Sequence, residues 1–334
     1  MTAYTKRLQK VTAVLCTTAL LAGCAAGTSD STEPAATTAQ VKAITIEPTA
    51  AYQTMNGFGA SACWWSQEVG NWENAKDILS LLYDENSGIG LNIYRYNLGA
   101  GSKDDATITD LDRRAEAFID KDGSYHWERD AAAQNALALA RSMNEDLRVT
   151  LFSNSAPVFY TANGKAYCDY LPDEENYVTN LEPERYADFA KYSIACAKHF
   201  TEAGYRVTGL SPINEPEWSW RGYEDGTAKQ EGCYYSKTQC RDLKQMAQED
   251  ALKDCRLEGW ESGHIGTDTC MAYLKTMFGK SGVNGLKNNA LRKGMPTLAL
   301  HSYWASPEEK QTFANAIATT YGSNYKLALT EYCQ

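Results

Sequence analysis

The sequence alternates between short apolar runs, most of which end in polar or aromatic residues, and longer segments rich in helix-forming residues. Such alternation predicts a parallel sheet whose strands are joined by right-handed crossover helices. Seven strand segments spread over about 280 residues predict an α/β fold, a (β/α)8 TIM barrel truncated after its seventh strand. The alternative is a doubly wound open sheet, which often carries a phosphate-binding loop, but the chain has no GxGxxG or Walker pattern.

Apolar spacing and Gly or Pro punctuation set the expected element boundaries. Gly204, for example, is the expected stop of the clearest helix. The predicted strands lie at 54–61, 89–97, 148–152, 206–214, 264–267, 297–304 and 326–332. The predicted helices lie at 71–83, 130–147, 181–204, 238–256, 268–280 and 307–321.

Two of these strands deliver a glutamate near their carboxyl ends. The apolar run from Val207 to Leu210 leads to Asn214 and Glu215, and the run from Leu327 to Leu329 leads to Glu331. The carboxyl ends of barrel strands meet on one face, where such enzymes place their active sites. Two carboxylates that face one cleft are the groups required for cleavage of a glycosidic bond.

The first residues have the composition of an export signal. Residues 1–23 contain a basic start and an apolar stretch too short to cross a bilayer, followed by Leu-Ala-Gly-Cys. This motif resembles the bacterial lipoprotein box, which predicts cleavage before Cys24, a lipid on its sulfur and an extracellular, surface-anchored protein. The alternative is an ordinary signal peptide with an incidental Cys24. Residues 24–42 are expected to be a tether and residues 43–334 the barrel.

Charge and cysteine content exclude some functions. The formal charge is -10, and loss of Lys6, Arg7 and Lys10 with residues 1–23 makes it -13. Such an acidic chain is not expected to bind nucleic acid, which requires Lys and Arg against phosphates. Eight cysteines remain beyond Cys24, which permits disulfides without fixing their pairing. No zinc-ligand spacing is present, so we expect no metal and no cofactor.

Five short motifs occur in order along the chain at barrel-like intervals. They are Gly-Phe-Gly-Ala-Ser at 57–61, Asn-Ile-Tyr-Arg-Tyr-Asn at 92–97, Ser-Asn-Ser-Ala-Pro at 153–157, Ser-Pro-Ile-Asn-Glu-Pro at 211–216 and Thr-Glu-Tyr at 330–332. With this set the chain, from about residue 44 to 334, resembles glycoside hydrolase family 30, within the clan of retaining barrel glycosidases. Trp64, Trp65 and the Gln-Glu-Gly-Cys of 230–233 resemble its endo-β-1,6-galactanase-like branch.

The resemblance implies roles for individual residues. Glu215 matches the acid/base, Glu331 the nucleophile, and Asn214 the residue that hydrogen-bonds the sugar 2-hydroxyl. Arg95 and Tyr303 match groups that surround the nucleophile and keep it ionised. Members of the family continue with an eighth strand and a β-sandwich side domain, to which 44–47 would belong, whereas this sequence stops at Gln334. We therefore expect a truncated barrel with two open edges.

The remaining candidates each have a structural alternative. Asn154 is a candidate substrate contact or a turn cap, and His301 a sugar contact or a structural histidine. Trp64, Trp65, Trp218 and Trp304 are candidate stacking surfaces for sugars, although a Trp is more often simply packed. Glu217 and Glu231 are the competing acids. We expect Glu215 to hold a proton because its surroundings carry less compensating charge than those of Glu331.

The resulting hypothesis is a retaining endo-β-1,6-galactanase-like hydrolase that acts on a polysaccharide or oligosaccharide by a double displacement through two glutamates. Xylan, β-1,6-glucan and glucosylceramide-type substrates remain open within the same chemistry. From other classes, the alternatives are a surface glycan-binding lipoprotein without turnover, an inactive fragment, and a metal-dependent hydrolase, which no ligand spacing supports.

Overall fold

The computed structural model describes residues 45, 47–49, 54–173, 175–243, 254–279, 297–321 and 325–332. The chain divides into two units, 1–54 and 55–334, and the described helices and strands belong to the second. The predicted signal segment, Cys24 and the tether lie outside the described residues, as do Ile44 and Ile46 of the predicted side-domain strand. In the part of the chain that is described, no helix combines the length and apolar character needed to span a bilayer.

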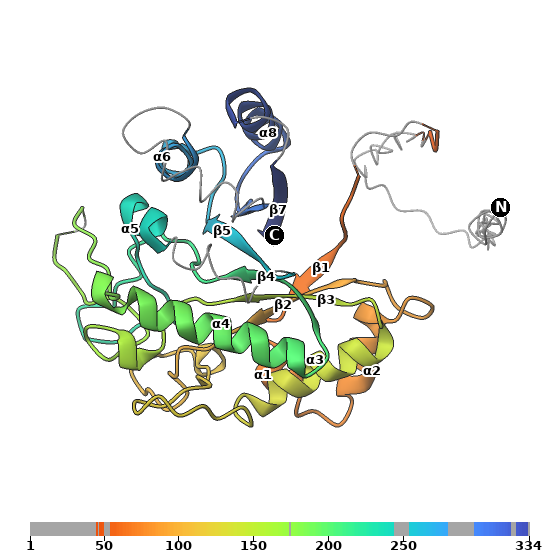
Figure 1. Ribbon diagram of the computed structural model, residues 1–334, viewed down its shortest axis with the longest axis horizontal. Helices are drawn as coiled ribbons and strands as arrows, with labels where there is room; N and C mark the ends of the chain where they lie inside the picture. The colour runs from red at the N-terminus through yellow and green to blue at the C-terminus, as the bar shows by residue number, and fades with distance from the viewer. Residues whose placement is uncertain are drawn as a thin grey trace, which may run out of the picture. The chain divides into compact units, whose positions relative to one another are not determined.

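Seven parallel strands form one sheet in the order of the sequence (Figure 1). Each strand pairs with the next along the chain, as expected for a (β/α) barrel, and the predicted fold class is confirmed. The strands are β1 (Gly59–Ser61), β2 (Ile93–Asn97), β3 (Arg148–Phe152), β4 (Arg206–Ser211), β5 (Arg256–Ser262), β6 (Thr297–His301) and β7 (Lys326–Glu331).

Helices follow most strands and lie around the sheet (Figure 1). The α-helices are α1 (Ser66–Val69), α2 (Ala75–Tyr83), α3 (Ala131–Met143), α4 (Tyr186–Glu202), α5 (Lys237–Asp242), α6 (Asp268–Phe278) and α8 (Pro307–Tyr321). The 3-10 turns are η2 (Leu111–Arg113), η3 (Val158–Tyr160) and η4 (Pro183–Arg185). Gly204 follows α4 with φ of 88°, a left-handed conformation that glycine adopts without steric cost, and it ends the helix as predicted.

The core lies between the strands and the helices that cover them. Residues of β2, β3 and β6 are almost all buried, because one face of each strand meets helices and the other faces the barrel interior. Phe200 of α4 packs against Tyr96 of β2 with ring centroids 4.9 Å apart. At the edges of the described sheet, Phe58 before β1 and Leu327 and Leu329 of β7 are exposed.

The fifth strand is where the sequence prediction was wrong. We expected a strand at 264–267, but β5 occupies Arg256–Ser262, with a turn at 265–266. Of the helix expected over 238–256, α5 (Lys237–Asp242) covers the start, and residues 244–253 lie outside the described residues. Glu258 and Glu261 interrupt the apolar character of β5, so it does not have the pattern of a buried strand. Glu261 is nevertheless fully buried, because cationic partners lie inside the barrel.

Two leucines of α2 test the packing of the helices on the barrel. Leu79 is fully buried and Leu81 is 65% exposed, although they are two positions apart. We expect Leu79→Ala to lower the free energy of unfolding by about 2–5 kcal/mol through lost burial and a residual cavity. The matched control Leu81→Ala should stay within about 0.5 kcal/mol of the parent. Equal losses in chemical denaturation would contradict this packing.

Candidate active site

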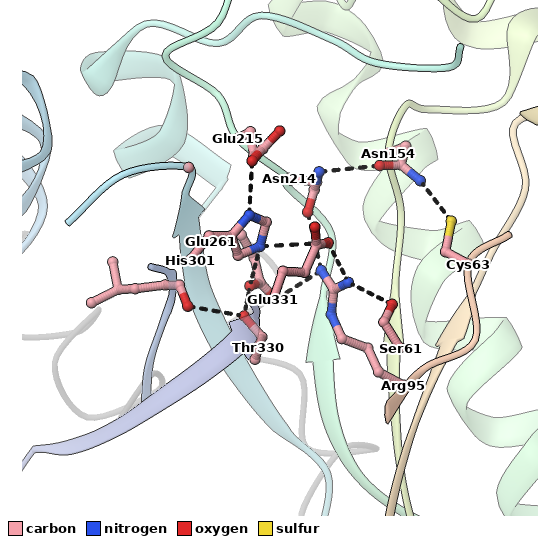
Figure 2. Close-up of polar contacts among 12 residues, drawn as sticks. Ser61, Cys63, Arg95, Asn154, Asn214, Glu215, Glu261, His301, Thr330 and Glu331 are labelled. Atoms are coloured by element: carbon pink, nitrogen blue, oxygen red, sulfur yellow. Dashed lines mark hydrogen bonds and ion pairs between the residues drawn. The ribbon is translucent and has the colours of Figure 1, made fainter. Parts of the chain in front are cut away.

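Glu215 and Glu331 meet at the carboxyl ends of the strands. Glu215 follows β4, Glu331 ends β7, and His301 ends β6 between them (Figure 2). One carboxylate oxygen from each glutamate and one ring nitrogen of His301 all lie within 4.8 Å of one another. The parallel register makes this possible, because a shift between Leu300 and His301 sets His301 opposite Glu331. The two glutamates therefore share one site.

Arg95 is the cation at the centre of this site. It projects from β2 and is 3% exposed. Its Nη1 donates to Glu331 Oε1 at 2.5 Å and to Ser61 Oγ at 3.1 Å (Figure 2). Its Nη2 donates to Asn214 Oδ1 at 3.0 Å and lies 3.4 Å from Glu261 Oε1. The guanidinium carbon also lies over the Phe152 ring, 3.3 Å from its centroid. The charge of Arg95 therefore interacts with groups of the site and not with solvent.

Glu331 is held in its ionised form. Burial alone would raise its pKa, but the charges of Arg95 and His301 and a hydrogen bond from Tyr303 hold the pKa below its ordinary value. The Tyr303 hydroxyl donates to Glu331 Oε2 at 2.7 Å, while Arg95 occupies Oε1. An ionised carboxylate with both oxygens oriented has the properties of a positioned nucleophile.

His301 links the carboxylates. It is fully buried, with Nδ1 2.9 Å from Glu215 Oε1 and Nε2 3.2 Å from Glu261 Oε2. Burial opposes its charge, but Glu331, Glu215 and Glu261 outweigh that effect and raise the pKa of His301 to about 9. At neutral pH the ring is therefore an imidazolium that donates from both nitrogens.

Glu261 is a member of the site that the sequence prediction missed. Burial raises its pKa, but Arg95, His301 and a hydrogen bond from Thr330 outweigh burial and lower the pKa to about 2. Glu261 therefore balances the two cations inside the barrel. The available signal was a glutamate directly after Trp260, in a segment for which the sequence pattern predicted no helix or strand.

The backbone at Glu215 is also unusual. Glu215 has φ of 42° and Glu261 has φ of 53°, both in the left-handed region that non-glycine residues rarely occupy. The Glu215 N–H donates to the Glu261 carbonyl at 2.9 Å, and Trp220 Nε1 donates to the Glu215 carbonyl at 2.8 Å. Such conformations cost on the order of 1–3 kcal/mol each and are concentrated at functional sites.

The sequence predicted less compensating charge around Glu215 than around Glu331. In the structure His301 lies 2.9 Å from Glu215, whereas both Arg95 and His301 lie close to Glu331. The sequence does not reveal that His301 and Glu215 meet across the site.

Asn214 belongs to a row of buried asparagines. Its Nδ2 donates to Asn154 Oδ1 at 3.1 Å (Figure 2), and Asn154 Nδ2 donates to Asn97 Oδ1 at 3.2 Å. Asn154 also lies 3.5 Å from Cys63 Sγ. Asn154 is therefore joined to the site through Asn214 and does not merely cap a turn.

The four tryptophans predicted as stacking surfaces lie in different environments. Trp65 packs against Tyr94 and donates to the Ser61 carbonyl, so it belongs to the core. Trp64 is partly buried. Trp218 and Trp304 are 42% and 78% exposed, and they are the ones whose faces a sugar can reach.

Gly263 is a second residue that we had not singled out. A Cβ added at this position would lie 2.3 Å from Trp218 Nε1 and 2.8 Å from Glu215 Oε1. No real Cβ tolerates such distances, so the absence of a side chain at 263 leaves the space that Glu215 and Trp218 occupy. The sequence offered only a glycine after a strand.

The two competing acids have structural partners. Glu217 accepts hydrogen bonds from Ser262 Oγ at 2.5 Å and from the Gly263 N–H at 2.7 Å, which ties it to the end of β5. Glu231 is fully buried and accepts from Ser102 Oγ at 2.6 Å and from the Ala100 N–H. Both carboxylates therefore stabilise loops through these hydrogen bonds.

Glu215, His301 and Glu331 also have the donor atoms of a metal site. The ring nitrogens of His301 face the carboxylates of Glu215 and Glu261, however, and its raised pKa disfavours the neutral ring that a metal needs. Arg95 already supplies positive charge to Glu331. The absence of a metal requirement stays a prediction, which activity after treatment with a chelator would test.

Comparison with known proteins places the chain in context. A family model described as O-Glycosyl hydrolase family 30 matches residues 41–256. An endo-beta-1,6-galactanase from Hypocrea rufa is 29% identical, over 58% of this chain and 43% of that protein. An exo-beta-1,6-galactobiohydrolase from Bifidobacterium longum subsp. longum is 27% identical, over 54% of this chain and 16% of that protein. The chain therefore spans less than half the length of these two curated relatives.

A solved structure supports the same fold. A conserved exported protein from Bacteroides fragilis aligns with a TM-score of 0.72 and 25% identity, covering 86% of this chain and 62% of that one.

The charge of His301 makes stability depend on pH. Its pKa is raised from 6.5 to about 9, so the stabilisation is fully present below about pH 6.5 and is lost as the pH rises through 9. We expect the free energy of unfolding to fall by roughly 2 kcal/mol between about pH 7 and pH 9.5 from this group. In His301→Gln this part of the pH dependence should disappear. The free energy of unfolding would be measured by denaturant titration at each pH. If it depends on pH in the same way in both proteins, His301 is not charged in the folded state.

Proposed function

The chain belongs to O-glycosyl hydrolase family 30, and we propose that it is a retaining hydrolase of β-linked galactan in which Glu331 is the nucleophile and Glu215 the acid/base. The observation that carries the proposal is the approach of the two carboxylates within 4.8 Å. Retaining glycosidases need carboxyl groups about 5–5.5 Å apart, whereas inverting enzymes need about 6.5–9.5 Å to admit a water molecule.

In the first step, a Glu331 oxygen attacks the anomeric carbon of the sugar. The leaving oxygen departs with a proton, and a glycosyl ester forms on Glu331. Arg95 and Tyr303 hold Glu331 ionised and oriented before the attack. Asn214, fixed by Arg95 and Asn154, is in place to hydrogen-bond the sugar hydroxyl next to the anomeric carbon.

The proton for the leaving oxygen comes from the Glu215–His301 pair. Glu331 is the carboxylate whose charge does most to raise the pKa of His301. When Glu331 becomes an ester it loses that charge, so the imidazolium becomes more acidic at the moment when the leaving oxygen needs a proton. The proton passes from His301 Nδ1 to Glu215, and Glu215 protonates the leaving oxygen.

In the second step, the roles reverse. Glu215, now a carboxylate, removes a proton from a water molecule that attacks the anomeric carbon of the ester. Glu331 leaves as a carboxylate, and its recovered charge raises the pKa of His301 again. The proton taken from water passes from Glu215 back to His301 Nδ1, so the site returns to its starting protonation state after each turnover.

Substrate and location follow from the relatives and the sequence together. The two curated relatives are named for activity on β-1,6-linked galactose, which favours galactan over xylan or β-1,6-glucan. Trp218 and Trp304 supply exposed aromatic faces on which sugars can stack. The similar Bacteroides fragilis protein is described as exported, which fits a chain that is exported and anchored by a lipid at Cys24.

The two glutamates should respond differently to the leaving group. Glu331→Ala should lose about 10⁴-fold or more in kcat on every substrate, because no ester can form. Glu215→Ala should lose about 10²–10⁴-fold in kcat/KM on galactan but much less in kcat/KM on an aryl galactoside, whose leaving group needs no proton. Glu308→Ala, an exposed glutamate of α8, is the control and should match the parent. Equal losses for both glutamates on the aryl galactoside would exclude this assignment.

Substrate class can be separated from mechanism by a panel of polysaccharides. We expect the highest kcat/KM on β-1,6-galactan, with lower values on β-1,6-glucan and xylan, and products that first appear as the β-anomer in NMR spectra. A preference for xylan or β-1,6-glucan would change the proposed substrate and leave the proposed mechanism standing. Initial release of the α-anomer would contradict the retaining mechanism itself.

A further inference from the structure

Two long loops beside the site are joined to each other. One precedes α4 and contains Cys168, and the other follows β4 and contains Trp220 and Cys233. Their backbones are paired, because the Cys168 N–H donates to the Trp220 carbonyl at 2.9 Å and the Gly222 N–H to the Cys168 carbonyl at 2.8 Å. Gly232 also donates to the Ala166 carbonyl at 2.8 Å. These contacts bring Cys168 and Cys233 together.

The two thiols lie in contact inside this junction. Both are buried and both are reduced in the structure. The N–H of Tyr234 points to Cys168 Sγ at 3.4 Å, so this sulfur lies against the peptide bond that follows Cys233. The Cys168 and Cys233 side chains are hydrogen-bonded to each other. Other described cysteines have different partners, such as Asn154 for Cys63 and the Tyr235 carbonyl for Cys240.

The surroundings also favour a reactive sulfur at Cys233. Burial raises the pKa of this thiol, but hydrogen bonds from Cys168, from the backbone of Asn180 and from Thr179 outweigh burial and lower it. A thiol whose pKa is lowered forms the thiolate that attacks a disulfide. The pair therefore has both the contact and the chemistry for oxidation.

We propose that Cys168 and Cys233 are joined by a disulfide in the exported protein. Two thiols lose two protons and two electrons as the S–S bond forms, and the disulfide of a thiol–disulfide oxidoreductase, or glutathione disulfide, accepts them and becomes two thiols. The Cys233 thiolate attacks that disulfide, and Cys168 then displaces the partner from the mixed disulfide. Since both sulfurs are buried in the folded chain, the exchange takes place while the two loops are still closing.

The bond would stabilise the loop that carries the backbone of the site. Trp220, whose carbonyl accepts from the Cys168 N–H, also donates its indole N–H to the Glu215 carbonyl. A covalent link at Cys168 is therefore two contacts away from the proposed acid/base. A disulfide between Cys168 and Cys233 would close the long stretch of chain between them, which strongly restricts the conformations of the unfolded chain.

Peptide mapping of the full chain after export to a bacterial periplasm tests the bond directly. Trypsin releases Cys168 in peptide 166–185 and Cys233 in peptide 230–237, and each peptide contains no other cysteine. Without reductant, we expect these peptides as one linked species whose mass is their sum less two hydrogen atoms, and separate peptides after reduction. Both peptides fully alkylated without reductant, or either linked to a different cysteine, would overturn the proposal.

Thermal unfolding with and without dithiothreitol separates the bond from mere packing. We expect reductant to lower the Tm of the parent by about 5 °C or more. The double variant Cys168→Ser/Cys233→Ser should melt at one temperature regardless of reductant. Cys196→Ser, which removes a buried thiol of α4, should keep the response of the parent. A parent whose Tm ignores reductant would overturn the proposal, even if the double variant fails to fold.

Discussion

The buried guanidinium of Arg95 is the interaction on which the rest of the site depends. It contacts Glu331, Asn214 and Ser61, and its charge faces Glu261, which has no exposure to solvent. A carboxylate in such a place without a partner would either be strongly destabilising or take up a proton. Together with the His301 imidazolium, Arg95 places two positive charges among three glutamates. Glu331 can therefore stay ionised at the end of β7 although it is largely surrounded by protein.

The geometry of the barrel fixes the positions of these positive and negative charges relative to one another. Each charged group comes from a different strand or strand end, so the parallel register fixes their separations before any substrate arrives. Glu215 and Glu261 both have left-handed backbone conformations, and a hydrogen bond between their backbones holds the two residues in place. Moving charge off Glu331 changes the pKa of His301, and this coupling links the proposed nucleophile to the proposed proton donor.

Sequence reasoning predicted the strands that carry Arg95, Glu215, His301 and Glu331, because apolar runs that end in polar residues are a strong local pattern. It could not predict β5, since Glu258 and Glu261 are compatible with a buried strand only when cations from β2 and β6 are nearby. For the same reason it did not predict that His301 contacts Glu215. A pattern along the chain reports neighbours in sequence, whereas the protonation of these groups is set by neighbours across the barrel.

The most direct test of the account is to find which carboxylate becomes esterified. An activated galactoside with fluorine in place of the second hydroxyl should form an ester that hydrolyses slowly, which allows peptide mapping of the labelled protein. The account predicts the label on the tryptic peptide that begins at Leu327, at Glu331, which is the sole acidic side chain among residues 327–334. A label on peptide 207–221, which contains Glu215, or on the peptide with Glu261 would contradict the assignment of Glu331 as the nucleophile held by Arg95.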